Sequence, residues 1–220
     1  MDLIEATFPP LWRWAAAALL VPIAAWAAWT APWRRLADNE QSHVWAGTIL
    51  CLLLLWQLRA SVGFGFTFHL LGVSLFTLLA GPQLALLGTA VVAALFIVVH
   101  DGAWANYALA TLVAIVPMFV TSGVLRASER WLPPNVFIFF FVVSFLGSGI
   151  ALAAVGIAAS TAVVLGAGQP AGIVFGEYVP YFLYLGFGEA TITGMLTTML
   201  VVYRPSWVTT FDDARYLSRR

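Results

Sequence analysis

Long stretches with almost no charge divide this chain, and they decide what it can fold into. Charged residues or Pro and Gly clusters separate seven of them, at about residues 12–30, 44–58, 64–80, 82–99, 105–124, 135–165 and 178–202. About 20 consecutive apolar residues form a helix that crosses the hydrocarbon core of a bilayer. The strands of a membrane barrel would instead alternate polar and apolar residues over about ten positions. The sequence therefore predicts an all-α, polytopic membrane bundle of about seven transmembrane helices.

The sixth stretch is longer than a perpendicular crossing requires. A helix over residues 135–165 therefore either tilts or breaks in two near Gly147-Ser148-Gly149. Small residues at 147–149 and 153–156 form faces that could pack inside the chain or against a partner.

Composition excludes most other classes of protein. Of the 220 residues 62% are hydrophobic and 9% charged, whereas soluble domains carry about a quarter charged residues. A formal net charge of zero gives no basic footprint for nucleic acid. We expect residues 1–220 to form a single integral membrane domain surrounded by lipid, with no room for a soluble catalytic domain.

The arginines predict the orientation in the membrane. If the N-terminus lies outside, only Arg13 and Arg59 are on the outer side, and the other arginines are cytoplasmic, as the positive-inside rule requires. The cytoplasmic set is Arg34, Arg35, Arg126, Arg130, Arg204, Arg215, Arg219 and Arg220. We therefore expect an N-out, C-in, multi-pass protein of a bacterial-type inner membrane. The first helix is expected to be retained, because Asp2 and Glu5 precede it rather than the basic cluster of a signal peptide.

His69 is the first candidate for a binding role. It lies in the third predicted helix, with Gly65 and Gly72 on the same helical face. These small neighbours either leave space beside an imidazole that binds a ligand or let another helix approach and hydrogen-bond to it. The sequence does not separate these two alternatives.

A second polar group follows the fourth predicted helix. His100, Asp101 and Asn106 lie within seven residues beside Gly102, on the expected outer side. Imidazole, carboxylate and amide groups at this spacing could build the mouth of a metal or cation site. The alternative is a polar turn that only caps two helices, and for Asp101 we favour it.

Glu189 lies near the middle of the last predicted helix, and Thr193 follows one turn later. A carboxyl group at membrane depth must be protonated, paired or facing a polar cavity, so we expect a functional role. The sequence contains no Gly-x-Ser-x-Gly, no His-Glu-x-x-His and no Gly-rich phosphate loop with Lys, which argues against an enzyme.

Several of these motifs, in this order, resemble one family. They are the stretch 65–72 (Gly-Phe-Thr-Phe-His-Leu-Leu-Gly), Gly81-Pro82, His100-Asp101-Gly102 with Asn106, and the stretch 189–194 (Glu-Ala-Thr-Ile-Thr-Gly) with Arg204-Pro205. Together they are similar to the substrate-capture permeases of cobalt and nickel energy-coupling-factor transporters, the cobalamin-biosynthesis M-type permeases. The resemblance implies a seven-helix bundle that binds a divalent ion from outside. It also implies a transmembrane coupling subunit and ATPase subunits as partners, and a metal-ligand role for the histidine that matches His69.

One difference from that family concerns the start of the chain. Its best-known members begin Met-His-Ile-Pro, and that histidine and the terminal amine complete the ion site, whereas this chain has Asp2. Asp2 or Glu5 could supply oxygen ligands instead, which would favour a different ion. We therefore expect a cobalt- or nickel-like ion as substrate, no covalently bound cofactor, and His69, His100, Asp101, Asn106 and Asp2 as candidate ligands. The alternative is a non-transporting membrane subunit or assembly factor that kept the fold and lost the ion site.

Overall fold

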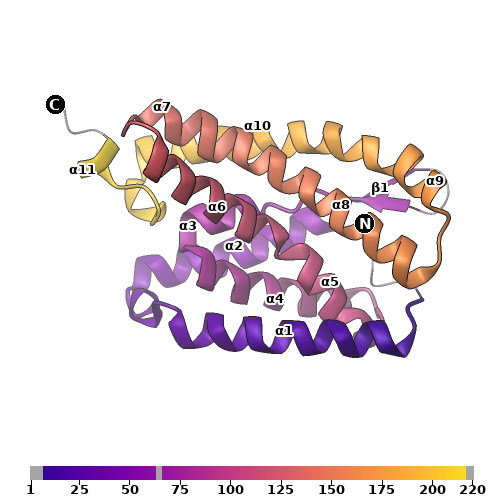
Figure 1. The fold of residues 1–220 in the computed structure, drawn as a ribbon. Coiled ribbons are helices and arrows are strands. Elements are labelled where there is room, and N and C mark those ends of the chain that lie inside the picture. The colour runs from indigo at the N-terminus through magenta and orange to yellow at the C-terminus, as the bar shows by residue number, and fades with distance from the viewer. Residues whose placement is uncertain (1–6, 63–65, 217–220) are drawn as a thin grey trace.

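The structure is a computed structural model that describes residues 7–62 and 66–216. Its helices form one elongated bundle, with strand β1 and helix α9 at one end and helix α11 at the other (Figure 1). The elements in chain order are α1 (Pro10–Thr30), η1 (Trp33–Ala37), α2 (Asn39–Gln57), β1 (Ala60–Val62), β2 (Phe66–Phe68), α3 (Val73–Ala80), α4 (Pro82–Val99), η3 (Trp104–Asn106), α5 (Tyr107–Ala114), α6 (Val116–Trp131), α7 (Val136–Ile138), η4 (Phe139–Leu146), α8 (Gly147–Ala167), α9 (Ala171–Ile173), η5 (Val174–Tyr178), α10 (Val179–Tyr203), η6 (Pro205–Trp207) and α11 (Asp213–Tyr216).

The predicted helical membrane bundle is confirmed. Within the described residues, five helical stretches are long and apolar enough to cross a membrane. They are Pro10–Thr30, Pro82–Val99, Trp104–Trp131, Val136–Ala167 and Ala171–Tyr203. Helix α2 packs beside α4 in the same bundle, but its first turns are polar. The number of seven crossings stays a prediction.

The prediction of a continuous helix over residues 64–80 is wrong in its first half. Strands β1 and β2 pair as an antiparallel hairpin with Ala60 opposite Phe68. A non-helical segment, residues 69–72, follows the hairpin, and α3 begins only at Val73. Alternating aromatic and β-branched residues in β2 suit a strand, so an apolar run here does not require a helix.

Gly72 gives the physical reason for the late start of α3. Its φ is +67°, in the left-handed region that interrupts a right-handed helix. His69 therefore does not share a helical face with Gly72, contrary to the prediction. Gly65, the other expected neighbour, lies outside the described residues.

For the sixth helix, the structure favours the unbroken alternative over the break near Gly147. Helix is continuous from Val136 to Ala167, and it changes from π-helical turns to α-helix at Gly147. Within the π-helical part the hydroxyl of Ser144 donates to the carbonyl oxygen of Phe139, five residues earlier, at 3.0 Å. Because π turns keep the backbone hydrogen-bonded, the change of helix type at Gly147 does not interrupt the helix.

Glycines bring α8 and α10 into close contact. A Cβ on Gly186 would lie 3.1 Å from the carbonyl oxygen of Gly149, and a Cβ on Gly149 would lie 3.3 Å from that of Gly186. Farther along α8, a Cβ on Gly156 would lie 2.4 Å from the ring of Phe182. Backbones approach this closely only where small residues face one another, so both small-residue faces contribute to packing within the chain.

Helix α3 packs against α2, α4, α6 and α10 toward the α11 end of the bundle (Figure 1), and all but one of its eight residues are buried. A buried helix end is stable only if other groups take up its unpaired backbone atoms. At the C-terminal end the backbone N–H groups of Thr209 and Thr210 donate to the carbonyl oxygens of Leu79 and Leu78, at 3.1 and 3.3 Å. The segment after α10 thereby pairs carbonyl groups at the C-terminal end of α3. At the N-terminal end, the side chain of Glu189 on α10 accepts from the backbone N–H of Gly72.

Candidate functional site

The candidate site is built around residues 69–72, the non-helical segment between β2 and α3. Helix α2 contributes Trp56 to its surroundings, α4 contributes Phe96, and α10 contributes Glu189. Three helices that are distant in sequence therefore meet at four residues, one of which is His69.

Glu189 binds the backbone of this segment with both of its carboxyl oxygens. The N–H of Leu71 donates to Oε2 at 3.1 Å, and the N–H of Gly72 donates to Oε1 at 2.7 Å. The side chain is 3% exposed. Both oxygens accept, so neither bond requires a proton on the carboxyl group, and negative charge is favourable beside the N-terminus of α3. The sequence could not name this partner, because it is backbone.

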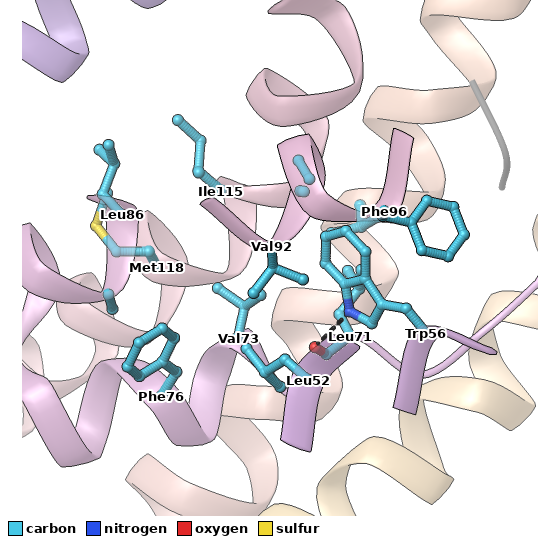
Figure 2. Packing of buried hydrophobic residues seen from close by; sticks show 14 of the residues in the cluster. Leu52, Trp56, Leu71, Val73, Phe76, Leu86, Val92, Phe96, Ile115 and Met118 are labelled. Atoms are coloured by element: carbon cyan, nitrogen blue, oxygen red, sulfur yellow. Dashed lines mark hydrogen bonds between the residues drawn. The ribbon is translucent and has the colours of Figure 1, made fainter. Parts of the chain in front are cut away.

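Trp56 holds the same segment through a backbone carbonyl group. Its indole N–H donates to the carbonyl oxygen of Leu71 at 3.0 Å, the dashed line in Figure 2. Leu71 is thus bound through its N–H by α10 and through its carbonyl by α2. Gly72 packs closely on α2 as well, since a Cβ at this position would lie 2.4 Å from Cδ2 of Leu52.

His69 lies among aromatic rings, outside the five membrane-spanning stretches. Its ring centroid is 5.2 Å from that of Trp56 and 6.3 Å from that of Phe96. Its Nδ1 is 3.2 Å from the carbonyl oxygen of Leu70, which can only accept, so Nδ1 carries the proton and Nε2 keeps a lone pair. Burial lowers the pKa of His69 to about 3, so the imidazole is neutral at pH 7. A neutral imidazole with a free Nε2 is the form that binds metal ions.

His100 joins this cluster through Phe96. The ring centroids of His100 and Phe96 are 4.3 Å apart, and Nδ1 of His100 is 3.0 Å from the carbonyl oxygen of Phe96. The guanidinium carbon of Arg59 lies 5.1 Å from the Phe96 centroid. Phe96 therefore contacts both histidines, and His100 also has Nε2 as the nitrogen left for a ligand.

Asp101 lies in the turn that ends α4. It is exposed, with φ of +49°, and the N–H of Gly102 donates to the carbonyl oxygen of Ile97 at 2.9 Å. This is the hydrogen bond of a Schellman helix end, in which the left-handed position is occupied here by Asp101. Asn106, at the end of η3, is buried with 2% exposure.

The described residues do not assemble a complete set of metal ligands. Within them no group of three or more His, Cys, Asp or Glu could hold an ion. His69, His100 and Asp101 accordingly do not form such a ligand group by themselves. Asp2, the remaining candidate, lies outside the described residues.

A groove of about 780 Å³ runs between α2, α3 and α10. Glu189 and Thr193 line it near Gly72, and His43 lines it at the start of α2. Thr193 is 1% exposed and lies one turn after Glu189 on α10. Because the polar groups of α10 face this groove, they point toward α2 and α3.

Sequence reasoning missed Trp56 and the backbone N–H groups of Leu71 and Gly72. Trp56 resembles the many other tryptophans of the chain, and backbone groups leave no signature in a sequence. The one available signal was Gly72, since a glycine inside an apolar run is compatible with a left-handed position.

Fold and site together define a class: a polytopic membrane protein that holds a neutral, partly buried imidazole beside polar backbone contacts. The chain belongs to the family described as the cobalt uptake substrate-specific transmembrane region, whose sequence model matches residues 3–207. It is thus a membrane component of metal transport and not an enzyme, and the family resemblance seen in the sequence is confirmed.

Two crystal structures share the fold. One is a truncated transition metal transporter, with a TM-score of 0.70 and 19% identity over 89% of this chain and 96% of that chain. The other is a transition metal transporter, with a TM-score of 0.67 and 19% identity over 88% of this chain and 89% of that chain. No curated protein matches the sequence.

Proposed function

We propose that the chain is the substrate-capture subunit of an energy-coupling-factor transporter and binds a divalent transition-metal ion, cobalt- or nickel-like, from the outer side of a bacterial-type inner membrane. Membership of the cobalt-uptake family supports the substrate class. The observation that carries the proposal is His69, whose ring lies against Leu70, Trp56 and Phe96 and whose Nε2 makes no hydrogen bond to the part of the chain that the structure describes.

In this proposal His69 is the central ligand. His100, Asp101, Asn106 and Asp2 are the candidates for completing the coordination shell, since imidazole, carboxylate and amide groups all bind divalent transition metals. His100 is favoured among the described candidates because it shares Phe96 with His69. Glu189 and Thr193 act as intramembrane polar residues behind the ion site.

The proposed topology has seven crossings with the N-terminus outside and the C-terminus inside. The distribution of arginines supports it, because Arg34 and Arg35 in η1, Arg130 at the end of α6 and Arg215 in α11 gather at one end of the bundle. Hydrogen bonds join the elements of this end, including Gln41 to the carbonyl oxygen of Ser206 and Arg215 to that of Glu129. His69 lies toward the opposite end, which the positive-inside rule assigns to the outside.

Transport against a gradient requires an energy source that this chain does not encode. Its sequence has no Gly-rich loop with Lys to cradle the phosphates of ATP. We therefore propose a transmembrane coupling subunit and ATPase subunits as partners, as the family resemblance implies.

Equilibrium binding of Co²⁺ and Ni²⁺ to the purified chain in detergent tests the proposal. The wild-type protein is expected to bind one ion, and His69→Ala to lose most of this affinity, because the imidazole that binds the ion is gone. His43→Ala is the matched control, since His43 is an exposed histidine of α2 and its loss should leave binding unchanged. Absence of binding by any preparation would refute the capture function and favour the assembly-factor alternative.

A further inference from the structure

We infer that Glu189 and Trp56 are positioning residues for the ion site, which fix two consecutive peptide groups and through them the imidazole of His69. This inference deepens the proposed function and rests on it. Neither residue is assigned as an ion ligand: both act on His69 through the backbone of residues 70–72.

The first of the two peptide groups joins Leu70 to Leu71. Its carbonyl oxygen lies 3.2 Å from Nδ1 of His69, and its N–H donates to Oε2 of Glu189 at 3.1 Å. A peptide group is rigid and planar, so a displacement at one of these bonds is transmitted to the other. Glu189 is therefore connected to the His69 ring by one rigid unit.

The second peptide group joins Leu71 to Gly72. Its carbonyl oxygen accepts the indole N–H of Trp56 at 3.0 Å, and its N–H donates to Oε1 of Glu189 at 2.7 Å. The two N–H groups thus converge on one carboxyl group, while the two carbonyls face two aromatic N–H groups. These four hydrogen bonds restrain rotation of both peptide planes.

The arrangement also has an electronic consequence for His69. An acceptor on the N–H of the Leu70–Leu71 peptide polarises the peptide group and makes its carbonyl oxygen a stronger acceptor. A stronger hydrogen bond from Nδ1–H makes Nε2 a better electron-pair donor to a metal ion. A carboxylate that accepts directly from a metal-bound histidine has the same effect. Here a peptide group stands between Glu189 and the imidazole.

Capping of α3 alone does not account for these contacts. A helix cap would use the unpaired N–H groups of the first turn, which begin at Gly72, the residue directly before α3. The second oxygen of Glu189 binds the N–H of Leu71, one residue farther from the helix, and Trp56 binds the carbonyl of Leu71. Both additional bonds lie on the side of the segment that leads to His69.

Two variants and two matched controls test the inference on the full chain in detergent. Glu189→Gln keeps the side-chain length, but its single carbonyl oxygen can replace only one of the two acceptors, and Trp56→Phe keeps a ring without the indole donor. Glu40→Gln removes a carboxylate that accepts from Trp207 at 2.7 Å, and Trp45→Phe removes an indole that donates to the carbonyl of Leu84 at 3.0 Å. The controls thus remove the same two kinds of hydrogen-bonding group, a carboxylate and an indole N–H, at positions away from residues 69–72.

The first readout is the Kd for Co²⁺, measured by calorimetry with the metal alone as the probe. Removal of a group that orients a metal-bound histidine typically weakens binding about 10- to 100-fold. We expect Glu189→Gln to weaken Co²⁺ binding at least about 10-fold and Trp56→Phe several-fold. Both controls should stay within about twofold of wild type.

The second readout needs no metal: hydrogen–deuterium exchange at the amides of Leu71 and Gly72, which should be faster in Glu189→Gln. A Gln variant with a lower Tm but an unchanged Kd would overturn the inference, because a purely structural role predicts that result. If this variant does not fold, an unchanged Kd for Trp56→Phe overturns it. Wild-type protein that binds no Co²⁺ would instead refute the proposed function itself.

Discussion

Replacing Gly72 by alanine tests how the segment at residues 69–72 is built. At φ of +67° an L-residue costs about 1–2 kcal/mol relative to the right-handed region. The new Cβ would also lie 2.4 Å from Cδ2 of Leu52, which is 4% exposed and packed in the core. Overpacking of this kind costs roughly 1–3 kcal/mol. Together the two effects predict a loss of about 2–5 kcal/mol in the free energy of unfolding.

Thermal and denaturant-induced unfolding in a single detergent would measure this loss. Gly47→Ala on α2 is the matched control, since a Cβ there has no neighbour within 4 Å. In a helix interior that change should be neutral or stabilising by up to about 1 kcal/mol.

A double-mutant cycle separates the two contributions. In a Leu52→Ala background the 2.4 Å overlap is absent and only a 3.2 Å approach to Cδ2 of Leu55 remains, so Gly72→Ala should cost little more than the conformational part, about 1–2 kcal/mol. Gly72→Ala that is as harmless as Gly47→Ala would refute the left-handed, tightly packed segment and with it the geometry proposed around His69.

Three further outcomes are expected. Thr210→Val removes a hydroxyl that donates to the carbonyl oxygen of Leu78 at 2.7 Å and should lower the free energy of unfolding by about 1 kcal/mol; an unchanged value would contradict the role of this segment in closing α3. The pKa of His69 falls from 6.5 to about 3 on folding, so the unfolded chain binds a proton that the folded chain excludes. Between pH 7 and 5 the metal-free protein should therefore lose up to about 2 kcal/mol, and His69→Gln should lack this part of the pH dependence in pH-dependent unfolding. In a variant without the native cysteine, Ala103→Cys and Ser206→Cys should react with an impermeant thiol reagent from opposite sides; labelling from the same side would refute the proposed topology.

The spanning helices were predictable because apolar length alone identifies them. The predicted stretch 82–99 coincides with α4, where Pro82 begins the helix and Gly102 closes the turn after it. The stretch 64–80 was not predictable in the same way. An apolar run also suits a strand, and only the left-handed conformation of Gly72 shows where the helix begins.

The candidate site was predictable only as a set of residue types. His69 and Glu189 stand out in a sequence because polar groups are costly among apolar residues. In the structure they meet at one four-residue segment: His69 begins it, and Glu189 binds its backbone. Their connection was not predictable, because it passes through the backbone of Leu71, more than a hundred residues before Glu189 in the chain. The role of Trp56 depends on the direction of one indole N–H, which no sequence pattern specifies.

X-ray absorption at the cobalt edge of the Co²⁺-loaded protein tests the central claim most directly. Scattering from an imidazole ring bound to the metal is expected in the wild-type spectrum, because His69 presents a free Nε2. This contribution should decrease in His69→Ala and persist in His43→Ala. A wild-type spectrum without imidazole scattering, or one that His69→Ala leaves unchanged, would contradict the assignment of His69 as a ligand.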